Sequence, residues 1–129
     1  MPATEVVLYR EEDGSIPLLD WLREVQQTNQ AAFAKCVTLI DYLEQFGRDL
    51  RRPRADMLRD GVYELRTQVR NVNYRLLYGF VGKNVAMLSH GLTKERTVPS
   101  REIDLAVARL ERFKKNPELY TATLEELNG

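Results

Sequence analysis

The sequence has few of the features that would place it outside the cell or in a membrane. Its one cysteine, Cys36, excludes an internal disulfide. The longest apolar runs, such as Val85 to Leu88, are far shorter than the roughly 18 residues that span a bilayer. The N-terminus also lacks the basic-then-apolar pattern of a secretory signal. We therefore expect a cytoplasmic protein that does not enter a membrane.

The single cysteine is also a poor candidate for a nucleophile. Cys36 lies among Ala32, Leu39 and Ile40 at helical spacing, where a small buried thiol is common. A reactive cysteine would need a base such as His90 beside it, and nothing in the sequence places the two together. We interpret Cys36 as a core residue.

Length and composition are those of one globular unit. The 129 residues are enough for one hydrophobic core and too few for two, and 43% hydrophobic with 29% charged residues is typical of a folded protein. We expect a single domain over residues 1–129. Its compact part covers about residues 5–113, and residues 114–129 form a C-terminal extension.

Charge is unevenly distributed, although the formal net charge is zero. Residues 1–47 carry three Lys/Arg against eight Asp/Glu, residues 48–101 carry twelve against five, and residues 102–129 carry four against six. A neutral chain argues against nucleic-acid binding, but a basic middle third can bind an anion if its arginines share a face. The alternative is scattered, solvated charge.

The first half of the chain predicts a strand and two helices. Residues 5–9 are β-prone, and Ser15 can cap a helix that has Pro17 in its first turn and ends near Gln27. A second helix ends at Gly47. Its apolar stripe consists of Phe33, Cys36, Val37, Leu39, Ile40 and Leu43.

The second half predicts strands followed by a helix. The charged, Pro-interrupted segment 48–54 should be an exposed loop able to contact a polyanion. The β-prone runs 62–69, 74–81 and 84–92 are separated by short turns, which favours an antiparallel meander. A helix that begins at Pro99 should pack on this sheet, and Asn116-Pro117 ends it. The tail is interpreted as a short helix or an arm.

Turn lengths predict which strand residues face each other. A two-residue loop at Gly82-Lys83 places Arg75 opposite His90, and a two-residue loop at Asn71-Val72 places Gln68 opposite Arg75. Arg66, Arg75 and His90 then share one face, and the loop of residues 91–96 leaves from its edge.

Such a cluster suits phosphate chemistry. The planar fork of arginine binds two phosphate oxygens and stabilises the charge that develops in phosphoryl transfer. His90 has a side chain that titrates near neutral pH, and Lys94 can transfer protons if neighbouring arginines lower its pKa.

Each residue of the cluster also has a structural interpretation. Arg66 can pair with Glu64 or Glu95, and a lone histidine is often structural. Three aromatic side chains that alternate with Arg75 should point to the opposite face, where core packing is favoured over stacking on RNA bases. They are Tyr74, Tyr78 and Phe80.

Four segments together resemble a known family. "GVYELR" (61–66), "YRLLY" (74–78), "HGLTK" (90–94) and the helix of residues 99–110 are similar to the HigB-like branch, including phage-derived relatives, of the RelE/ParE toxin superfamily. The resemblance implies an α+β fold of order β-α-α-β-β-β-α with a curved antiparallel sheet. It also implies metal-independent cleavage of messenger RNA on translating ribosomes without a cofactor, and neutralisation by a cognate antitoxin, commonly a helix-turn-helix protein.

Site residues carried over from this resemblance are Arg66, Arg75, His90 and Lys94 as catalytic residues, with no metal ligands. The chain departs from the family pattern at Glu95, where a second lysine is common, and in its neutral charge. The further arginines expected to contact RNA are Arg51, Arg52, Arg54, Arg59, Arg70 and Arg96.

Two other functions fit the same pattern. One is a gyrase-targeting toxin of the same superfamily, which has no nuclease activity. The other is a non-catalytic, phage-derived module that uses its basic face to bind a partner or to regulate a gene.

Overall fold

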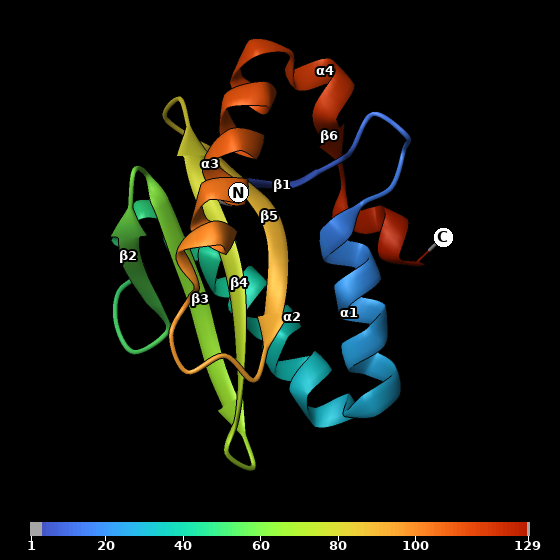
Figure 1. Ribbon diagram of the computed structural model, residues 1–129, viewed down its shortest axis with the longest axis vertical. Helices are drawn as coiled ribbons and strands as arrows, with labels where there is room; N and C mark the ends of the chain where they lie inside the picture. The colour runs from blue at the N-terminus through green and yellow to red at the C-terminus, as the bar shows by residue number, and fades with distance from the viewer. Residues whose placement is uncertain (1–3, 129) are drawn as a thin grey trace.

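The structure is a computed structural model that describes residues 4–128 (Figure 1). The strands are β1 (Glu5–Tyr9), β2 (Ala55–Arg59), β3 (Val62–Val69), β4 (Val72–Val81), β5 (Val85–Thr93) and β6 (Thr121–Ala122). The helices are α1 (Pro17–Thr28), α2 (Gln30–Phe46), α3 (Ser100–Lys115) and α4 (Pro117–Tyr120). Short 3-10 turns cover Gly47–Asp49 and Leu124–Asn128. None of the helices in the described part is both long enough and apolar enough to cross a membrane.

The sheet is mixed, with the strand order β2-β3-β4-β5-β1-β6. The strands β2 to β5 form an antiparallel meander, so the predicted α+β class and the central hairpins are confirmed. The antiparallel arrangement does not extend to β1, which pairs with β5 in parallel. No turn joins these two strands, because α1, α2 and three strands lie between them in sequence, and so no hairpin forces them to be antiparallel.

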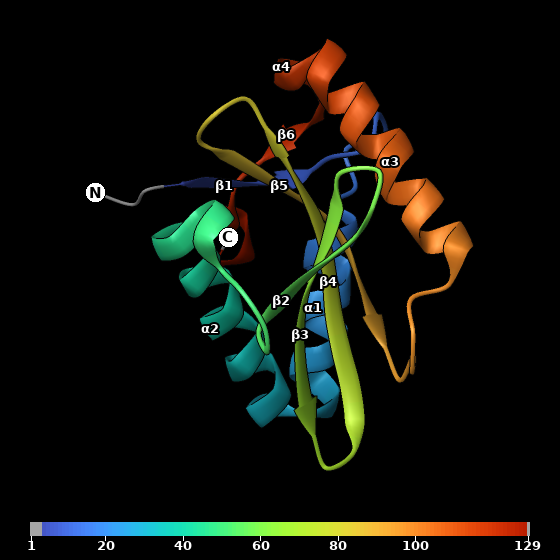
Figure 2. The ribbon, with the colours of Figure 1, turned by 90° about the vertical axis from the view of Figure 1, so that its left-hand side faces the viewer.

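Helices cover both faces of the sheet, and each face has its own core. In Figure 2, α2 and α3 lie on opposite sides of the strands. The core under α1 and α2 contains Leu22, Leu43, Leu65, Leu76 and Tyr78. The core under α3 contains Val62, Leu77, Met87, Ile103 and Leu110. The predicted packing of Tyr74, Tyr78 and Phe80 away from the arginine face is confirmed, because all three contact the first core.

Helix boundaries follow local signals, with one exception. Asn29 caps α2 by accepting a hydrogen bond from the Ala32 N–H at 3.0 Å, and Gly47 ends the helix with φ +49°. The predicted cap of α1 at Ser15 is wrong. Ser15 bonds the Asp13 carboxylate instead, and the helix begins one residue after Ile16.

Two strands were absent from the sequence-based expectation. β2 is short and mixed in polarity, so no apolar alternation marks it. The C-terminal residues do not form a loose arm, because β6 pairs with β1 and the Tyr120 ring stacks on Tyr9 at a centroid distance of 5.6 Å. Arg10 also forms a two-pronged pair with Glu126 at 2.9 and 2.8 Å.

The turn between β3 and β4 is shifted from the predicted position. Val69 pairs with Val72, so the loop is Arg70-Asn71, and both loop residues have positive φ. Arg66, and not Gln68, therefore lies directly opposite Arg75. The shift is an even number of residues, which keeps both arginines on one face.

The β4–β5 hairpin also differs in register. Val81 pairs with Val85 across a three-residue loop, and an irregularity beside Leu77 shifts the pairing again. His90 therefore lies opposite Leu77, while Arg75 lies opposite Leu92. Because side chains alternate along a strand, Arg75, Leu77 and His90 still point to the α3 face. The common face is as predicted, but the direct pairing of Arg75 with His90 is wrong.

The packing of α1 on β5 requires a glycine at position 91. A Cβ atom there would overlap the indole ring of Trp21, whose Nε1–H donates to Thr93 Oγ1 at 3.0 Å. We predict that Gly91→Ala lowers the free energy of unfolding by about 1–3 kcal/mol, the usual cost of overpacking. Urea denaturation measures this change. Gly91→Ala combined with Trp21→Leu should regain part of the loss, and an unchanged midpoint for Gly91→Ala alone would contradict the packing.

Candidate nucleic-acid interface

A groove of about 650 Å³ runs along the end of β3 beside α2. It exists because β2 is shorter than β3. The pairing of β2 with β3 stops near Ala55 and Leu65, whereas β3 continues to Val69. We call this hollow the β3-edge groove. It is lined by Ala34, Lys35, Thr38, Leu39, Tyr42, Pro53, Arg54, Arg66, Thr67, Gln68, Asn73 and Arg75.

The β3-edge groove is positively charged. Its charged lining residues are Lys35, Arg54, Arg66 and Arg75, and among the described residues no Asp or Glu lines it. The Arg54 guanidinium lies over the Tyr42 ring, 4.5 Å from its centroid. Four cations thus share one surface of a protein with no net charge, and two of them, Arg66 and Arg75, pair with Glu64.

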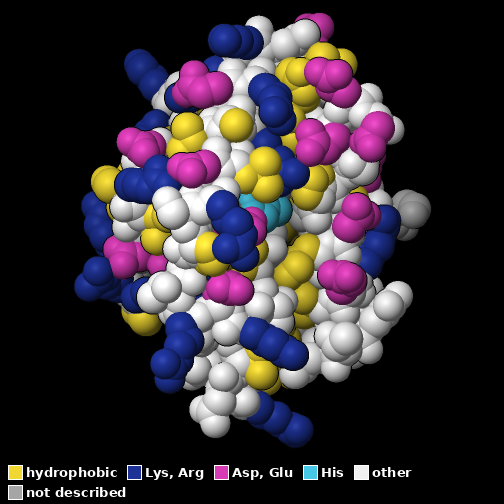
Figure 3. Space-filling view, viewed as in Figure 1, with side chains coloured by type: hydrophobic (Ala, Val, Ile, Leu, Met, Phe, Trp, Pro, Cys, Tyr) yellow, Lys and Arg dark blue, Asp and Glu magenta, His cyan; other side chains and the backbone are white. Residues whose placement is uncertain are grey.

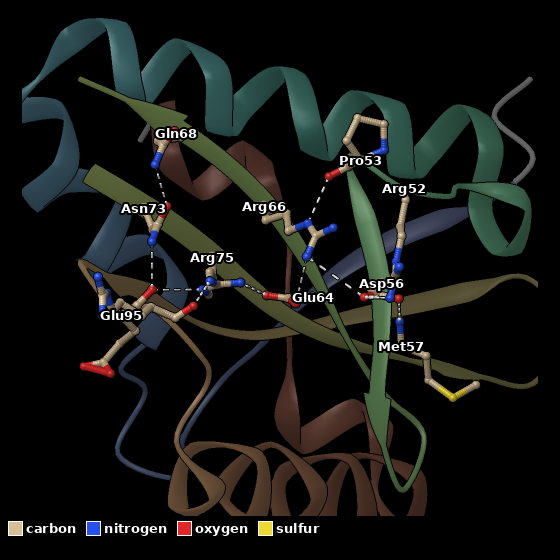
Figure 4. Close-up of polar contacts among 11 residues, drawn as sticks. Arg52, Pro53, Asp56, Met57, Glu64, Arg66, Gln68, Asn73, Arg75 and Glu95 are labelled. Atoms are coloured by element: carbon tan, nitrogen blue, oxygen red, sulfur yellow. Dashed lines mark hydrogen bonds and ion pairs between the residues drawn. The ribbon is translucent and has the colours of Figure 1, made fainter. Parts of the chain in front are cut away.

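Arg66 and Arg75 differ in how far they are open to solvent. Their guanidinium groups meet at the Glu64 carboxylate, as Figure 4 shows. The Arg66 side chain is 35% exposed and donates from Nε to Pro53 O at 3.1 Å, while its Nη1 lies 3.8 Å from Glu64 and 4.0 Å from Asp56. Arg66 therefore keeps N–H groups available to a ligand in the groove.

The guanidinium group of Arg75 is engaged by other groups of the protein. Its side chain is 11% exposed and pairs with Glu64 through Nη1. Its Nε and Nη2 donate to the carbonyl oxygens of Glu95 and Arg96, which tie the β5–α3 loop to the sheet. The two arginines share a face as expected, but only Arg66 is accessible enough to be a direct phosphate ligand.

His90 belongs to a separate buried cluster beneath α3. Its Nε2 lies 2.9 Å from Glu102 Oε1 and its Nδ1 lies 2.7 Å from Ser89 Oγ. Arg109 approaches Ser89 Oγ at 3.4 Å and pairs with Glu11 at 3.1 Å. Burial lowers the pKa of His90, an effect that the Glu102 hydrogen bond partly offsets. Both imidazole nitrogens thus have partners within the protein.

Lys94 lies outside the β3-edge groove. It has φ +77° and is exposed in a second hollow that Glu24, Thr28 and Tyr74 also line. Its backbone N–H donates to Asn73 O at 2.8 Å, and Asn73 lines the β3-edge groove. The backbone of Lys94 is therefore next to the groove, while the side chain borders the other hollow.

Two of the arginines expected to bind RNA are held by carboxylates. Arg52 pairs with Asp56 at 2.9 Å, and Arg59 pairs with Asp104 at 2.7 Å. Arg51 bonds the carbonyl oxygen of Arg48. These contacts leave Arg51 and Arg52 beside a third hollow near β2, away from the groove.

The remaining expected RNA ligands are better placed. Arg54 lines the β3-edge groove, Arg70 is exposed at the tip of the β3–β4 hairpin, and Arg96 is exposed in the β5–α3 loop. Figure 3 shows Lys and Arg at the lower end of the α3 face, where Figure 1 places this hairpin, while acidic side chains gather in its upper right.

Sequence reasoning missed the contribution of α2. Lys35, Thr38 and Tyr42 form one wall of the groove, and their i, i+3, i+7 spacing on the polar side of the helix is the signal that could have identified them. It also missed Arg109, which is buried on the apolar face of α3 between Ala106 and Leu110.

Other chemistries find little support in the described residues. Within residues 4–128, no three His, Cys, Asp or Glu side chains are grouped as metal ligands. Cys36 is buried as predicted, and burial raises its pKa to about 12. A thiol with such a pKa is not a nucleophile near neutral pH.

Comparison with protein families assigns the chain to one of them. Residues 20–111 match the family described as "Phage derived protein Gp49-like (DUF891)". The match covers most of the chain, from α1 to α3, so the protein belongs to the Gp49-like family. A search of curated proteins finds no match.

We predict that the Glu64 carboxylate is required for stability. Glu64→Ala leaves the buried Arg75 without its counter-ion and should lower the free energy of unfolding by about 3–5 kcal/mol. Chemical denaturation measures the loss. Asp104→Ala is the matched control, because its exposed pair with Arg59 should contribute little. Equal midpoints for the two variants would contradict the role of Glu64.

We predict that His90 makes stability depend on pH. Its pKa is lower in the folded protein than the unfolded value of about 6.5, so the unfolded chain binds the proton more tightly. The His90 contribution is complete above pH 6.5 and declines as the pH falls through the folded pKa. Because the chain has one histidine, NMR of its imidazole reports the folded pKa directly. A pKa of 6.5 or higher would contradict this prediction, and His90→Gln should reduce the pH dependence of stability just below about pH 6.5.

Proposed function

We propose that this protein is the toxin of a type II toxin–antitoxin pair and cleaves single-stranded RNA without a metal ion. The observation that carries the proposal is the pairing of Arg66 with Arg75 across β3 and β4, with Arg66 open to a basic groove. Membership of the Gp49-like family and the resemblance of the strand and loop motifs to HigB-like toxins support it.

In this proposal the accessible cations bind the RNA backbone. Arg66 contacts the scissile phosphate through its free N–H groups, and Lys35 and Arg54 contact neighbouring phosphates along the groove. Arg75 is a positioning residue. It fixes Glu64 behind Arg66 and holds the loop that carries Arg96.

The cleavage step uses the RNA's own hydroxyl group. The 2′-oxygen loses its proton and forms a bond to phosphorus, the bond from phosphorus to the 5′-oxygen breaks, and that oxygen gains a proton. The products are a 2′,3′-cyclic phosphate and a 5′-hydroxyl. Proton transfer falls to Lys94 or His90. Both His90 nitrogens are engaged, so we favour Lys94, whose exposed side chain borders the neighbouring hollow and has to turn past Asn73 to reach a phosphate in the groove.

The proposal includes partners. The substrate is messenger RNA, expected on the translating ribosome, and the neutralising partner is a cognate antitoxin, expected to be a helix-turn-helix protein. Both follow from the resemblance to HigB-like toxins.

A second candidate function is RNA or partner binding without cleavage. It is favoured because Arg75 and His90 are bonded to other groups of the protein. Of the predicted catalytic residues on this face, Arg66 is then the accessible one. Under this alternative the protein binds RNA through the β3-edge groove and leaves it intact.

We predict that Arg66→Ala abolishes most RNA cleavage. The purified protein is incubated with a labelled single-stranded RNA in excess EDTA, and cyclic-phosphate products are resolved on a gel. Removal of one phosphate-binding group should slow cleavage by about 100-fold or more. The same RNA with 2′-deoxy nucleotides should not be cut, because it lacks the nucleophile.

The matched control for this experiment is Arg101→Ala, which removes an exposed arginine from α3 outside the groove. It should cleave at the wild-type rate. Arg66→Ala with undiminished cleavage would refute the site, and tight RNA binding by the wild type without any product, both on free RNA and on messenger RNA in a translating extract, would establish the non-catalytic alternative.

A further inference from the structure

The open edge of β3 presents main-chain groups to the β3-edge groove. The Arg66 N–H donates to Arg54 O at 2.9 Å, which marks the last link to the segment preceding β2. Main-chain groups of alternate residues point to the same side of a strand, so the N–H and C=O of Gln68 point to this side as well. Lys35 Nζ lies 3.5 Å from Gln68 O, which places that carbonyl toward α2.

The groove follows the strand edge and does not lie on one face of the sheet. Thr67 lines it from the α2 side, whereas Arg66 and Gln68 alternate with Thr67 and belong to the α3 side. Residues of both faces can border one hollow only where the neighbouring strand is missing. The wall opposite β3 is α2, with Leu39 and Tyr42 among its lining residues.

Two outward N–H groups of β2, by contrast, already have acceptors. The Ala55 N–H donates to Arg51 O at 3.2 Å, and the Met57 N–H donates to Asp56 Oδ1 at 3.0 Å. These are the groups that would otherwise point outward from β2, because those of Asp56 face Glu64 in β3. An outward N–H that can pair with an added strand is therefore expected at Gln68 of β3 and not at Ala55 or Met57 of β2.

We propose that the β3-edge groove binds an extended acidic segment of a partner protein, which pairs with β3 as an additional strand. A peptide main chain offers alternating N–H and C=O groups that match the C=O of Arg66 and the N–H and C=O of Gln68, because the Arg66 N–H is already bonded to Arg54 O. Its carboxylates face Arg66 on the α3 side of the sheet, and its alternate aliphatic side chains pack on Leu39 of α2. RNA matches the charge of the groove but has no repeating main-chain donor to pair with a strand edge.

Occupation of the groove also has a regulatory consequence. A strand in this position covers Arg66 and excludes an RNA phosphate, so the bound segment inhibits the protein. This consequence rests on the proposed function, whereas the docking itself does not.

The first test uses peptides and the full-length wild-type protein. The probe is a fluorescein-labelled octapeptide of alternating Glu and Val, and binding is followed by fluorescence anisotropy. The charge control is the octapeptide of alternating Lys and Val, which should not bind. Two further probes carry N-methyl groups on all Glu or on all Val residues. One of these two should bind about ten-fold more weakly or worse, because its blocked N–H groups face β3, and the other should retain binding.

The second test changes the strand edge. Gln68→Pro removes the outward N–H and places a ring where the added strand would lie. Proline is tolerated at such an edge position. It should weaken binding of the Glu-Val peptide by about ten-fold or more. Gln68→Ala keeps the N–H and should lose much less affinity for the peptide than Gln68→Pro does. A thermal melt shows whether Gln68→Pro is folded, and if it is not, the N-methyl probes decide the question.

Several results would overturn the docking proposal. Equal binding of the two N-methylated probes would show attraction by charge alone, and binding of an RNA oligonucleotide without any peptide binding would assign the groove to RNA. If the peptide binds but leaves RNA cleavage unchanged, the regulatory consequence fails. The cleavage assay without peptide tests the proposed function separately. Failure of the docking proposal and failure of the proposed function therefore give different results.

Discussion

Arg75 is bound to the Glu64 carboxylate and to two carbonyl oxygens of the β5–α3 loop, and the candidate site is arranged around these contacts. Burial of both charges costs solvation energy that only close pairing and additional hydrogen bonds recover. The contacts fix Glu64 behind Arg66 and fix the path of the loop that carries Lys94 and Arg96. A disturbance of Arg75 would therefore reach the groove, the loop and the interface with α3 together.

A protein without net charge obtains a basic groove by placing its carboxylates elsewhere. Asp56 and Glu64 lie behind the arginines they pair with, and Asp104 neutralises Arg59 on the α3 side. The groove itself is lined by cations and neutral groups. Local field depends on which charges share a surface, so the overall balance of charged residues says little about what this surface binds.

The secondary structure and the common arginine face could be predicted because they depend on local periodicity. The alternation of side chains along a strand kept Arg66 and Arg75 on one face even though both turns differed from the expected positions. The direct partner of Arg75 could not be predicted, since a three-residue loop and an irregularity near Leu77 shift the register. β2 was missed because five residues of mixed polarity carry no alternation.

The sequence by itself determined the order of the main elements, the faces of their side chains and the basic middle third, because backbone geometry sets these within a few residues. Only the tertiary structure decided that Arg66 is accessible while Arg75 and His90 are engaged, and that α2 supplies Lys35 to the groove. Solvent access and ion pairing depend on contacts between segments far apart in the chain. No local sequence pattern says how closely those segments pack.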